Sequence, residues 1–302
     1  MIRLIGSGSS GQVWLARNAL GFYRAVKIVQ ANRFKHFRHF EREFDGILKF
    51  EPVSRLHDGL VDILQVGRNE DDGYFYCVME LADDVVAGPN IYPPTYSPRT
   101  LEQDKARLGR HPVAECVRLG TAIASALGFL HRHGLFHRDI KPSNIIFVSG
   151  APKLADIGLV TDAPQSRSFV GTEGFLAPEG SGTVCADIYA LGKVLYEIST
   201  GKDRNEYPAL PEIPASRAET RDFLLLNRIV LKACRAKAWQ RYQTAEEMMR
   251  TLLAFEFDKA DLRNREYVGL VTKVFAVIGA MAALGVFGVT IWRIIWLSLL
   301  HK

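Results

Sequence analysis

Residues 137–144, His-Arg-Asp-Ile-Lys-Pro-Ser-Asn, constrain this chain more than any other segment. They bring a carboxylate (Asp139), a cation (Lys141) and an amide (Asn144) into one short loop. Phosphoryl transfer needs all three groups: a carboxylate that orients a hydroxyl nucleophile, a cation that neutralises the moving phosphoryl group, and an oxygen ligand for Mg²⁺. The run therefore indicates a phosphoryl-transfer site, provided that the other parts of such a site precede and follow it.

A glycine-rich stretch near the start has the pattern G-x-G-x-x-G-x-V over residues 6–13. Alone it is a weak signal, because a dinucleotide-binding loop looks similar but runs from a strand into a helix. Here residues 13–16 and 22–29 read as two strands joined by a turn at 18–21. A glycine loop between antiparallel strands suits a flap over phosphates, because its N–H groups reach anionic oxygens without side-chain interference.

The second of these strands carries Ala-Val-Lys at residues 25–27, which matches the V-A-I-K type of strand whose lysine contacts ATP phosphates. A helix is predicted over 34–50, because apolar residues recur on one face there. They are Phe37, Phe40, Phe44 and Ile47. A carboxylate of this helix should pair with Lys27. Glu43 fits better because it lies beside the apolar face, and Glu41 remains an alternative.

An apolar strand over 74–79 leads into a short linker and then a proline-rich, partly irregular excursion over residues 83–112, with a short helix near its end. A helix with inward apolar residues follows over 113–133 and ends at Gly134. It delivers the chain directly into the loop at 137–144. The excursion has no role that its residues reveal.

Three acidic residues follow the loop at informative positions. Asp156 begins Asp-Ile-Gly, where the metal-binding D-F-G is expected, with Ile157 in place of Phe. Glu179 ends an Ala-Pro-Glu run and needs a cationic partner, for which Arg241 is the best candidate. Asp187 is expected to cap the next helix and to hold the backbone of the catalytic loop.

With these motifs in order, residues 2–256 resemble a eukaryotic-type (Hanks-type) protein serine/threonine kinase of the bacterial branch. The resemblance implies an α+β, two-lobed protein kinase fold with ATP and Mg²⁺ (or Mn²⁺) between the lobes. It implies a kinase domain over 1–256, with a small β-rich N-lobe and one helix over about 1–79, a hinge at 80–83, and a larger α-helical C-lobe over about 84–256.

The resemblance also assigns roles to single residues. Asp139 is the expected base, and the other expected catalytic residues are Lys141, Lys27, Glu43 and Thr172. The expected nucleotide contacts are Gly6, Ser7, Gly8, Gly11, Val13, Ala25, Lys27, Met79, Glu80, Ala82 and Ile146, and the expected Mg²⁺ ligands are Asn144 and Asp156. Lys141 and Thr172 follow the serine/threonine-specific pattern rather than the tyrosine-specific one.

Arg138, beside the expected base, adds a regulatory hint. Such an arginine is commonly neutralised by a phosphate on the activation segment, which orders that segment. The available acceptors are Thr161, Ser166 and Ser168.

Composition narrows the class of protein. With 48% hydrophobic and 24% charged residues, the 302-residue chain is globular rather than disordered. Its formal net charge of +5 is mild, and no basic stripe with interleaved aromatic residues is present, so we expect no nucleic-acid partner. The four cysteines lack metal-ligand spacing and indicate buried, reduced thiols.

A separate segment indicates a membrane. Residues 274–292 are nineteen uncharged residues, long enough to cross a hydrocarbon core of ~30 Å at ~1.5 Å per residue. A buried core helix is the alternative, disfavoured because the segment has no polar face. A basic juxtamembrane linker (257–273) precedes it and a short tail (293–302) follows, so the positive-inside rule predicts a single-pass protein of the cell (inner) membrane with a cytoplasmic kinase domain. Small residues four apart in the segment allow a homodimer.

These observations predict a membrane-anchored kinase that transfers the ATP γ-phosphoryl group to serine and threonine hydroxyls of proteins, itself included. A pseudokinase-type signalling scaffold is the first alternative, but Lys27, Asp139, Asn144 and Asp156 are all present. A small-molecule phosphotransferase is the second, and the peptide-docking segment 172–179 argues against it.

Overall fold

The computed structural model describes residues 1–8, 11–156, 161–162, 171–212 and 217–255. One compact unit runs from Met1 to Leu253, and the residues from Ala254 onward form a second. The predicted juxtamembrane linker, membrane span and tail lie outside the described residues.

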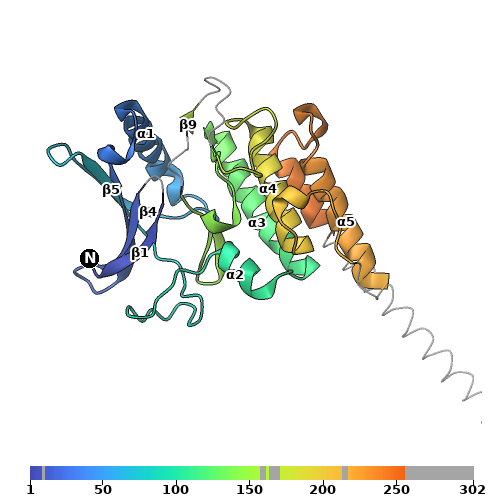
Figure 1. Cartoon of the computed structure of the whole chain (residues 1–302), viewed down its shortest axis with the longest axis horizontal. Coiled ribbons are helices and arrows are strands. Elements are labelled where there is room, and N and C mark those ends of the chain that lie inside the picture. Colours follow the sequence, from blue (N-terminus) through green and yellow to red (C-terminus); the bar gives the residue numbers. More distant parts are fainter. Residues whose placement is uncertain (9–10, 157–160, 163–170, 213–216, 256–302) are drawn as a thin grey trace, which may run out of the picture. The chain divides into compact units, whose positions relative to one another are not determined.

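A five-stranded antiparallel sheet forms the N-lobe, in the order β1-β2-β3-β5-β4 (Figure 1). Its strands are β1 (Arg3–Ser7), β2 (Gln12–Arg17), β3 (Tyr23–Gln30), β4 (Ile63–Asn69) and β5 (Tyr74–Met79). The predicted hairpin around residues 18–21 is confirmed as the link between β2 and β3. A Cβ at Gly11 would lie 2.4 Å from the Ile28 carbonyl oxygen, so the entry into β2 requires glycine.

The N-lobe helix α1 (Phe37–Ser54) begins three residues later than predicted, because residues 31–33 form a separate 3₁₀ turn. Phe40 is buried against Phe75 of β5, with ring centroids 5.2 Å apart, and Ile47 is also buried. The prediction that Phe37 faces inward is wrong, since its side chain is 60% exposed. Phe37 is the first helical residue, and it packs against the Phe40 ring from the solvent side.

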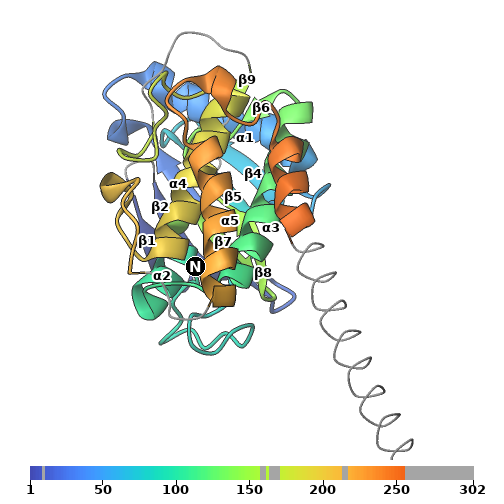
Figure 2. The same cartoon turned by 90° about the vertical axis from the view of Figure 1, so that its right-hand side faces the viewer.

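The C-lobe is helical. Its labelled helices are α2 (Leu101–Leu108), α3 (Val113–Arg132), α4 (Val184–Thr200) and α5 (Arg217–Ala233), with 3₁₀ turns η2 (Pro142–Asn144), η3 (Arg204–Glu206) and η4 (Ala238–Gln240). Residues 245–255 are also helical. Two short two-stranded sheets pair β6 (Leu135–Phe136) with β9 (Thr161–Asp162) and β7 (Ile145–Val148) with β8 (Ala151–Leu154). Helices α3, α4 and α5 pack side by side (Figures 1 and 2).

Helix α3 confirms the predicted helix over 113–133, and it ends before Gly134, whose φ of 72° is left-handed. Within the described part of the chain, α3 alone has the length and apolar composition to cross a membrane. Its apolar face is buried in the core of the C-lobe, with Val117, Leu127 and Leu130 at 0% exposure, as in the core helix of a globular domain.

The expected cap of α4 is wrong. Thr183, not Asp187, is the N-cap, and its hydroxyl accepts from the Ala186 N–H at 3.1 Å. Thr183 has an extended backbone that lets its short side chain reach this N–H. Asp187 lies one turn further on, where its carboxylate is available for other partners.

Arg241 pairs with Glu179 as predicted, through two hydrogen bonds of 2.6 and 2.8 Å. The guanidinium also donates to the carbonyls of Arg235, Cys185 and Ala236, which satisfies a side chain that is almost completely buried. This one residue joins the segment after α5 to the end of the Ala-Pro-Glu run.

All four cysteines are free, and three of them are buried as predicted. Burial raises the pKa of Cys77 to about 11 and those of Cys116 and Cys234 to about 12. These thiols are therefore protonated and unreactive at neutral pH. Cys185 differs from the prediction, since it is only half-buried at the short link before α4.

We predict that Arg241→Met lowers the free energy of unfolding by about 3 kcal/mol, because it leaves Glu179 and three carbonyls without their donor. Arg118→Met is the matched control. Arg118 pairs with Glu115 on the surface of α3 and is 47% exposed, so the change should cost less than about 1 kcal/mol. Urea denaturation of the two variants measures both values, and equal losses would contradict the buried role of Arg241.

Candidate active site

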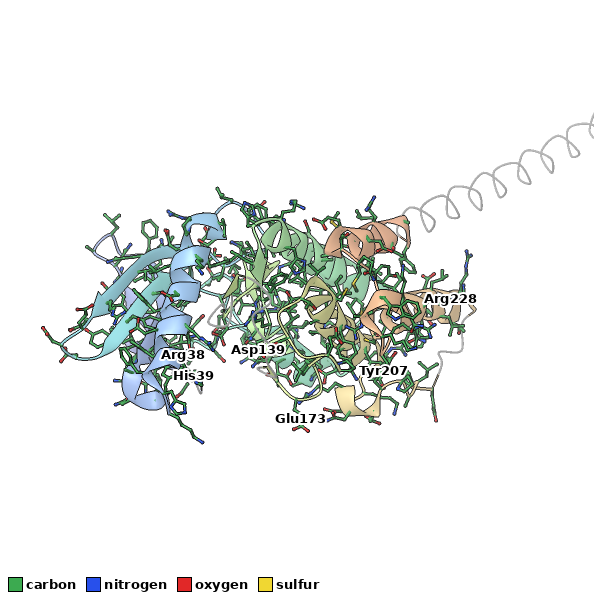
Figure 3. The ribbon with its side chains drawn as sticks, turned by 90° about the horizontal axis from the view of Figure 1, so that it is seen from above. Arg38, His39, Asp139, Glu173, Tyr207 and Arg228 are labelled. Carbon is green, nitrogen blue, oxygen red and sulfur yellow. The ribbon has the colours of Figure 1, made fainter. Side chains whose placement is uncertain are left out.

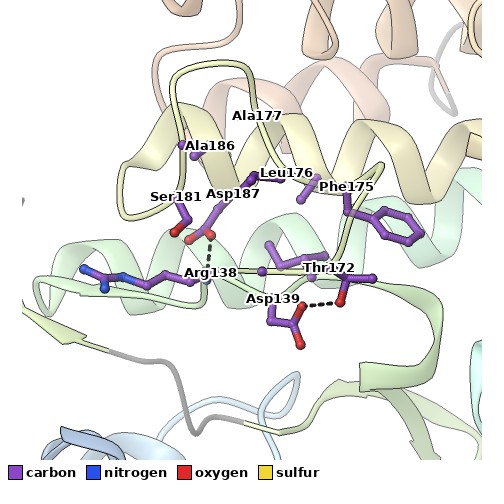
Figure 4. Close-up of a pocket in the computed structure, with 13 residues that line it drawn as sticks. Arg138, Asp139, Thr172, Phe175, Leu176, Ala177, Ser181, Ala186 and Asp187 are labelled. Carbon is purple, nitrogen blue, oxygen red and sulfur yellow. Dashed lines mark hydrogen bonds between the residues drawn. The ribbon is translucent and has the colours of Figure 1, made fainter. Parts of the chain in front are cut away.

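Asp187 of α4 holds the backbone of the catalytic loop through hydrogen bonds. Its two carboxylate oxygens accept the backbone N–H groups of His137 at 3.0 Å and Arg138 at 2.9 Å, and His131 Nε2 lies 2.9 Å away (Figure 4). Arg138 has a left-handed φ of 68°, so these bonds stabilise a strained backbone. Burial opposes ionisation of Asp187, but the hydrogen bonds and neighbouring histidines prevail and lower its pKa.

Asp139 is surrounded by the groups that the sequence placed near it. The Thr172 hydroxyl donates to Asp139 Oδ1 at 2.8 Å (Figure 4), and Lys141 Nζ lies 2.7 Å from Oδ2. Lys141 Nζ also donates to Thr172 Oγ1 at 2.9 Å, which closes a three-residue network across 33 residues of sequence. Figure 3 shows Asp139 between α1, which carries Arg38 and His39, and the C-lobe.

The two expected metal ligands come from adjacent backbone segments. The Asn144 amide donates to the carbonyl and to Oδ2 of Asp139, at 2.8 and 3.0 Å, which directs its nitrogen toward Asp139. The Ala155 N–H donates to the Asn144 carbonyl at 2.8 Å, so Asp156 follows directly beside Asn144. One amide oxygen and one carboxylate suit Mg²⁺, which takes few protein ligands and completes its shell with phosphates and water. The described residues contain no cluster of three or more His, Cys, Asp or Glu that could hold a metal by itself.

Lys27 of β3 joins the two lobes through its ammonium group. It lies 3.2 Å from Glu43 of α1 and 2.6 Å from Asp156. Burial opposes the charge on Lys27, but the two carboxylates outweigh it and raise its pKa above the ordinary value. The charge of Lys27 in turn lowers the pKa of Asp156. The predicted pairing of Lys27 with Glu43 is confirmed, whereas Glu41 pairs with Arg68 at 2.8 Å.

Asp156 has a left-handed φ of 59°, a second strained residue at this site. Its side chain remains 41% exposed, so the carboxylate is accessible from the space between the lobes. A strained backbone at a functional carboxylate persists only where surrounding contacts enforce it. Here the bond from Lys27 and the anchoring of the preceding residue to Asn144 provide those contacts.

The expected nucleotide-binding residues meet on one surface of the N-lobe sheet. Strand register pairs Val13 with Lys27 and Ala25 with Met79, which brings the glycine loop, the lysine and the end of β5 together. The glycine loop turns tightly, with the Gly8 N–H donating to the Gly11 carbonyl at 2.9 Å. Behind Lys27 lies a small, mainly apolar cavity. It is lined by Lys27, Ile47, Phe50, Val61, Ile63, Cys77, Met79 and Asp156.

Below this surface, Ile146 lies on β7, next to the hinge. An isolated bridge pairs it with Thr100 at the start of α2. Its side chain is half-buried.

Several residues of the site have no signal in the sequence. The Glu80 carboxylate accepts from Lys153 Nζ at 2.6 Å and from the Asp62 N–H at 2.9 Å, which fixes the first hinge residue. Asp83 and Tyr96 also contact the hinge region. Asp84 could have been read as a turn-former, because its carboxylate accepts the nearby Val86 and Ala87 N–H groups, but the partners of Asp83 lie 66 and 67 positions away in sequence.

The predictions for Ile157, Gly158, Ser166 and Ser168 concern residues outside the described ranges. The prediction for Thr161 concerns a side chain that is likewise not described. The regulatory hint at Arg138 therefore stays a prediction.

We predict that Asp187→Asn lowers the free energy of unfolding at pH 7 by about 2 kcal/mol, because it weakens hydrogen bonds to a charged acceptor. The folded-state pKa of Asp187 lies below the usual 3.8. Its contribution is therefore present above about pH 4 and is lost as the pH falls through the lowered pKa.

The difference in unfolding free energy between the wild type and Asp187→Asn should accordingly shrink between pH 5 and about pH 2, because the wild-type carboxylate becomes protonated. Urea titrations across this range measure it, with the exposed Asp58→Asn as the control that should change nothing. A deficit independent of pH would mean that packing, not the carboxylate charge, holds the loop.

Comparison with known proteins now identifies the family. The protein kinase domain family matches residues 1–259. The chain is 30% identical over 284 residues to the serine/threonine-protein kinase PrkC of Bacillus subtilis, covering 86% of this chain and 41% of PrkC. It is 28% identical over 278 residues to the serine/threonine-protein kinase PknB of Mycobacterium leprae, covering 83% of this chain and 42% of PknB.

The chain thus spans about two fifths of the length of these curated relatives. The family match extends across the N-lobe, the hinge, the catalytic loop and the C-lobe helices. This chain belongs to the protein kinase family.

Proposed function

We propose that this chain is a membrane-anchored protein serine/threonine kinase that transfers the γ-phosphoryl group of ATP to protein hydroxyls and also phosphorylates itself. The observation that carries the proposal is the network at Asp139, where Lys141 and Thr172 both bond to the same carboxylate. A scaffold that had lost catalysis would have no need to keep this arrangement.

The reaction assigns a task to each residue. The acceptor oxygen forms a bond to the γ-phosphorus while the bond from that phosphorus to the β–γ bridging oxygen breaks. The acceptor proton passes to Asp139, and Lys141 neutralises charge on the transferring group. Thr172, which donates to Asp139, helps to align the acceptor hydroxyl with that carboxylate.

The nucleotide contacts follow from the same residues. Lys27, fixed by Glu43, would bind the phosphates, and the glycine loop would cover them. Mg²⁺ held by Asn144 and Asp156 would neutralise phosphate charge. The Asp156 carboxylate supports this, because 41% of its side chain is exposed and available to a cation.

The acceptor class rests on two features. Lys141 and Thr172 follow the serine/threonine pattern and contact each other at 2.9 Å. The relatives PrkC and PknB carry serine/threonine-protein kinase in their names. We extend that specificity to this chain, with proteins as the substrates.

The membrane anchor is the part of the proposal that rests on sequence alone. We propose that residues 274–292 cross the cell (inner) membrane once, after a kinase domain over 1–256 and a basic linker over 257–273. The basic linker favours a cytoplasmic kinase domain. Small residues in the span would allow a homodimer.

We predict that the full chain, purified in lipid or detergent with Mg²⁺ and radiolabelled ATP, labels serine or threonine of itself or of a generic protein acceptor. Asp139→Asn should lower the transfer rate at least ~100-fold, the low end of the effect of a positioned base. Lys27→Met should lower it as well, because Glu43 and Asp156 lose their shared cation.

Lys35→Met and Asp58→Asn are matched controls on exposed residues and should keep the wild-type rate. Phosphoamino-acid analysis identifies the acceptor. Nucleotide binding without transfer by the wild-type chain in lipid would refute the kinase and favour the scaffold.

We also predict that the full chain sediments with membranes after an alkaline wash of fractionated cells. A chain without residues 268–302 should move to the soluble fraction, because it lacks the apolar span. A full chain that stays soluble would refute the anchor and leave the kinase proposal untouched.

A further inference from the structure

The connection between the hinge and α2 contains residues 84–99, which we call the hinge insertion. It is a compact structure rather than a slack loop. The Asp84 backbone forms bridges with Gly88 and Pro98. Its carboxylate accepts three backbone N–H groups, from Val86, Ala87 and Ser97, at 2.8–2.9 Å.

Both lobes contact this insertion. Arg3 of β1 donates to the Tyr96 carbonyl, which ties the insertion to the strand that leads into the glycine loop. Arg99 lies over the ring of Phe147 on β7, 4.2 Å from its centroid, and its N–H donates to the Asp83 carbonyl at 2.7 Å. The Asp83 carboxylate accepts two N–H groups of the β7–β8 turn at 2.8 Å.

At the centre of the insertion, Tyr96 reaches the hinge. Its side chain is 1% exposed, and its hydroxyl donates to the Ala82 carbonyl at 3.0 Å. Burial, with Asp84 and Asp83 nearby, raises the pKa of Tyr96 far above its usual value. The hydroxyl therefore stays protonated and acts as a donor throughout the physiological range.

The peptide after Ala82 is held at both ends. Tyr96 binds its carbonyl oxygen, and its N–H, which belongs to Asp83, donates to the Phe147 carbonyl at 2.7 Å. The Ala82 N–H belongs to the preceding peptide, which is joined to the held one through the Ala82 Cα. Holding the following peptide restricts rotation about the Ala82 backbone and so restricts the directions open to the Ala82 N–H.

The remaining polar groups of the hinge match an adenine edge. The Glu80 N–H donates to the Asp62 carbonyl at 3.1 Å, and Tyr96 occupies the Ala82 carbonyl. Among the described residues, none forms a hydrogen bond with the Glu80 carbonyl or with the Ala82 N–H. The Glu80 carbonyl supplies an acceptor and the Ala82 N–H a donor, and adenine offers one donor (the N6 amino group) beside one acceptor (N1).

We propose that Tyr96 is a positioning residue for the nucleotide: its hydroxyl fixes Ala82 so that the Ala82 N–H meets adenine N1. Tyr96 itself makes no contact with the reacting atoms. The inference rests on the proposed function, because it requires that ATP binds at this hinge.

The test uses the full chain with Tyr96→Phe, which removes only the hydroxyl. Tyr92→Phe is the matched control, since Tyr92 lies in the same insertion but is 65% exposed. The dissociation constant is measured for ATP and for 1-deaza-ATP, in which N1 is replaced by a carbon and cannot accept a hydrogen bond. The kcat and the KM for ATP are measured in parallel, and thermal melting checks the fold.

Tyr96→Phe should weaken ATP binding about five-fold, the value of one net hydrogen bond, and raise the KM by a similar factor with kcat unchanged. The loss should fall below about two-fold with 1-deaza-ATP, because the Ala82 N–H then has no acceptor to miss. Tyr92→Phe should match the wild type with both nucleotides.

Two results would overturn the inference. One is unchanged ATP affinity in Tyr96→Phe. The other is an equal loss with ATP and 1-deaza-ATP, which would mean that Tyr96 supports the site in general and not through Ala82. A wild-type chain that binds ATP but transfers no phosphate would refute the proposed function alone, since the binding comparison would still give its result.

Discussion

The buried carboxylate of Asp187 is the interaction on which the rest of the site depends. The catalytic loop must adopt a left-handed backbone at Arg138, and it can do so because two consecutive N–H groups are bound by that one carboxylate. The cost of burying a charge is offset by these bonds and by His131. Asp139 then stands where Lys141 and Thr172 can reach it, so the geometry of the base follows from a residue that never contacts a substrate.

Lys27 and the hinge insertion link the two lobes at opposite ends of the proposed nucleotide site. Lys27 bonds to α1 of the N-lobe and to Asp156 beside the catalytic loop, and the insertion bonds to β1 and to the β7–β8 turn. The first link uses charge, and the second uses backbone hydrogen bonds together with Tyr96. Both restrict the same degree of freedom, which is the opening of one lobe against the other.

Much of this arrangement could be predicted from the sequence. The β2–β3 hairpin, α3 and the pairs Lys27–Glu43 and Glu179–Arg241 follow from local periodicity or from motifs with fixed spacing. The failures were local as well. Phe37 fits the helical period of α1 but is exposed to solvent. The N-cap role that was predicted for Asp187 belongs to Thr183. Periodicity identifies a helix face, but it does not say where the opposing surface ends.

The sequence by itself determined the order of the elements and the chemistry of the loop at 137–144, because both depend on neighbours along the chain. Only the tertiary structure decided between the favoured Glu43 and its alternative Glu41 as the partner of Lys27, showed which N–H groups of the loop Asp187 binds, and revealed that Tyr96 reaches the Ala82 carbonyl. These contacts join residues that are 14 to 50 positions apart. Their formation depends on how separate elements pack, and no local pattern encodes that packing.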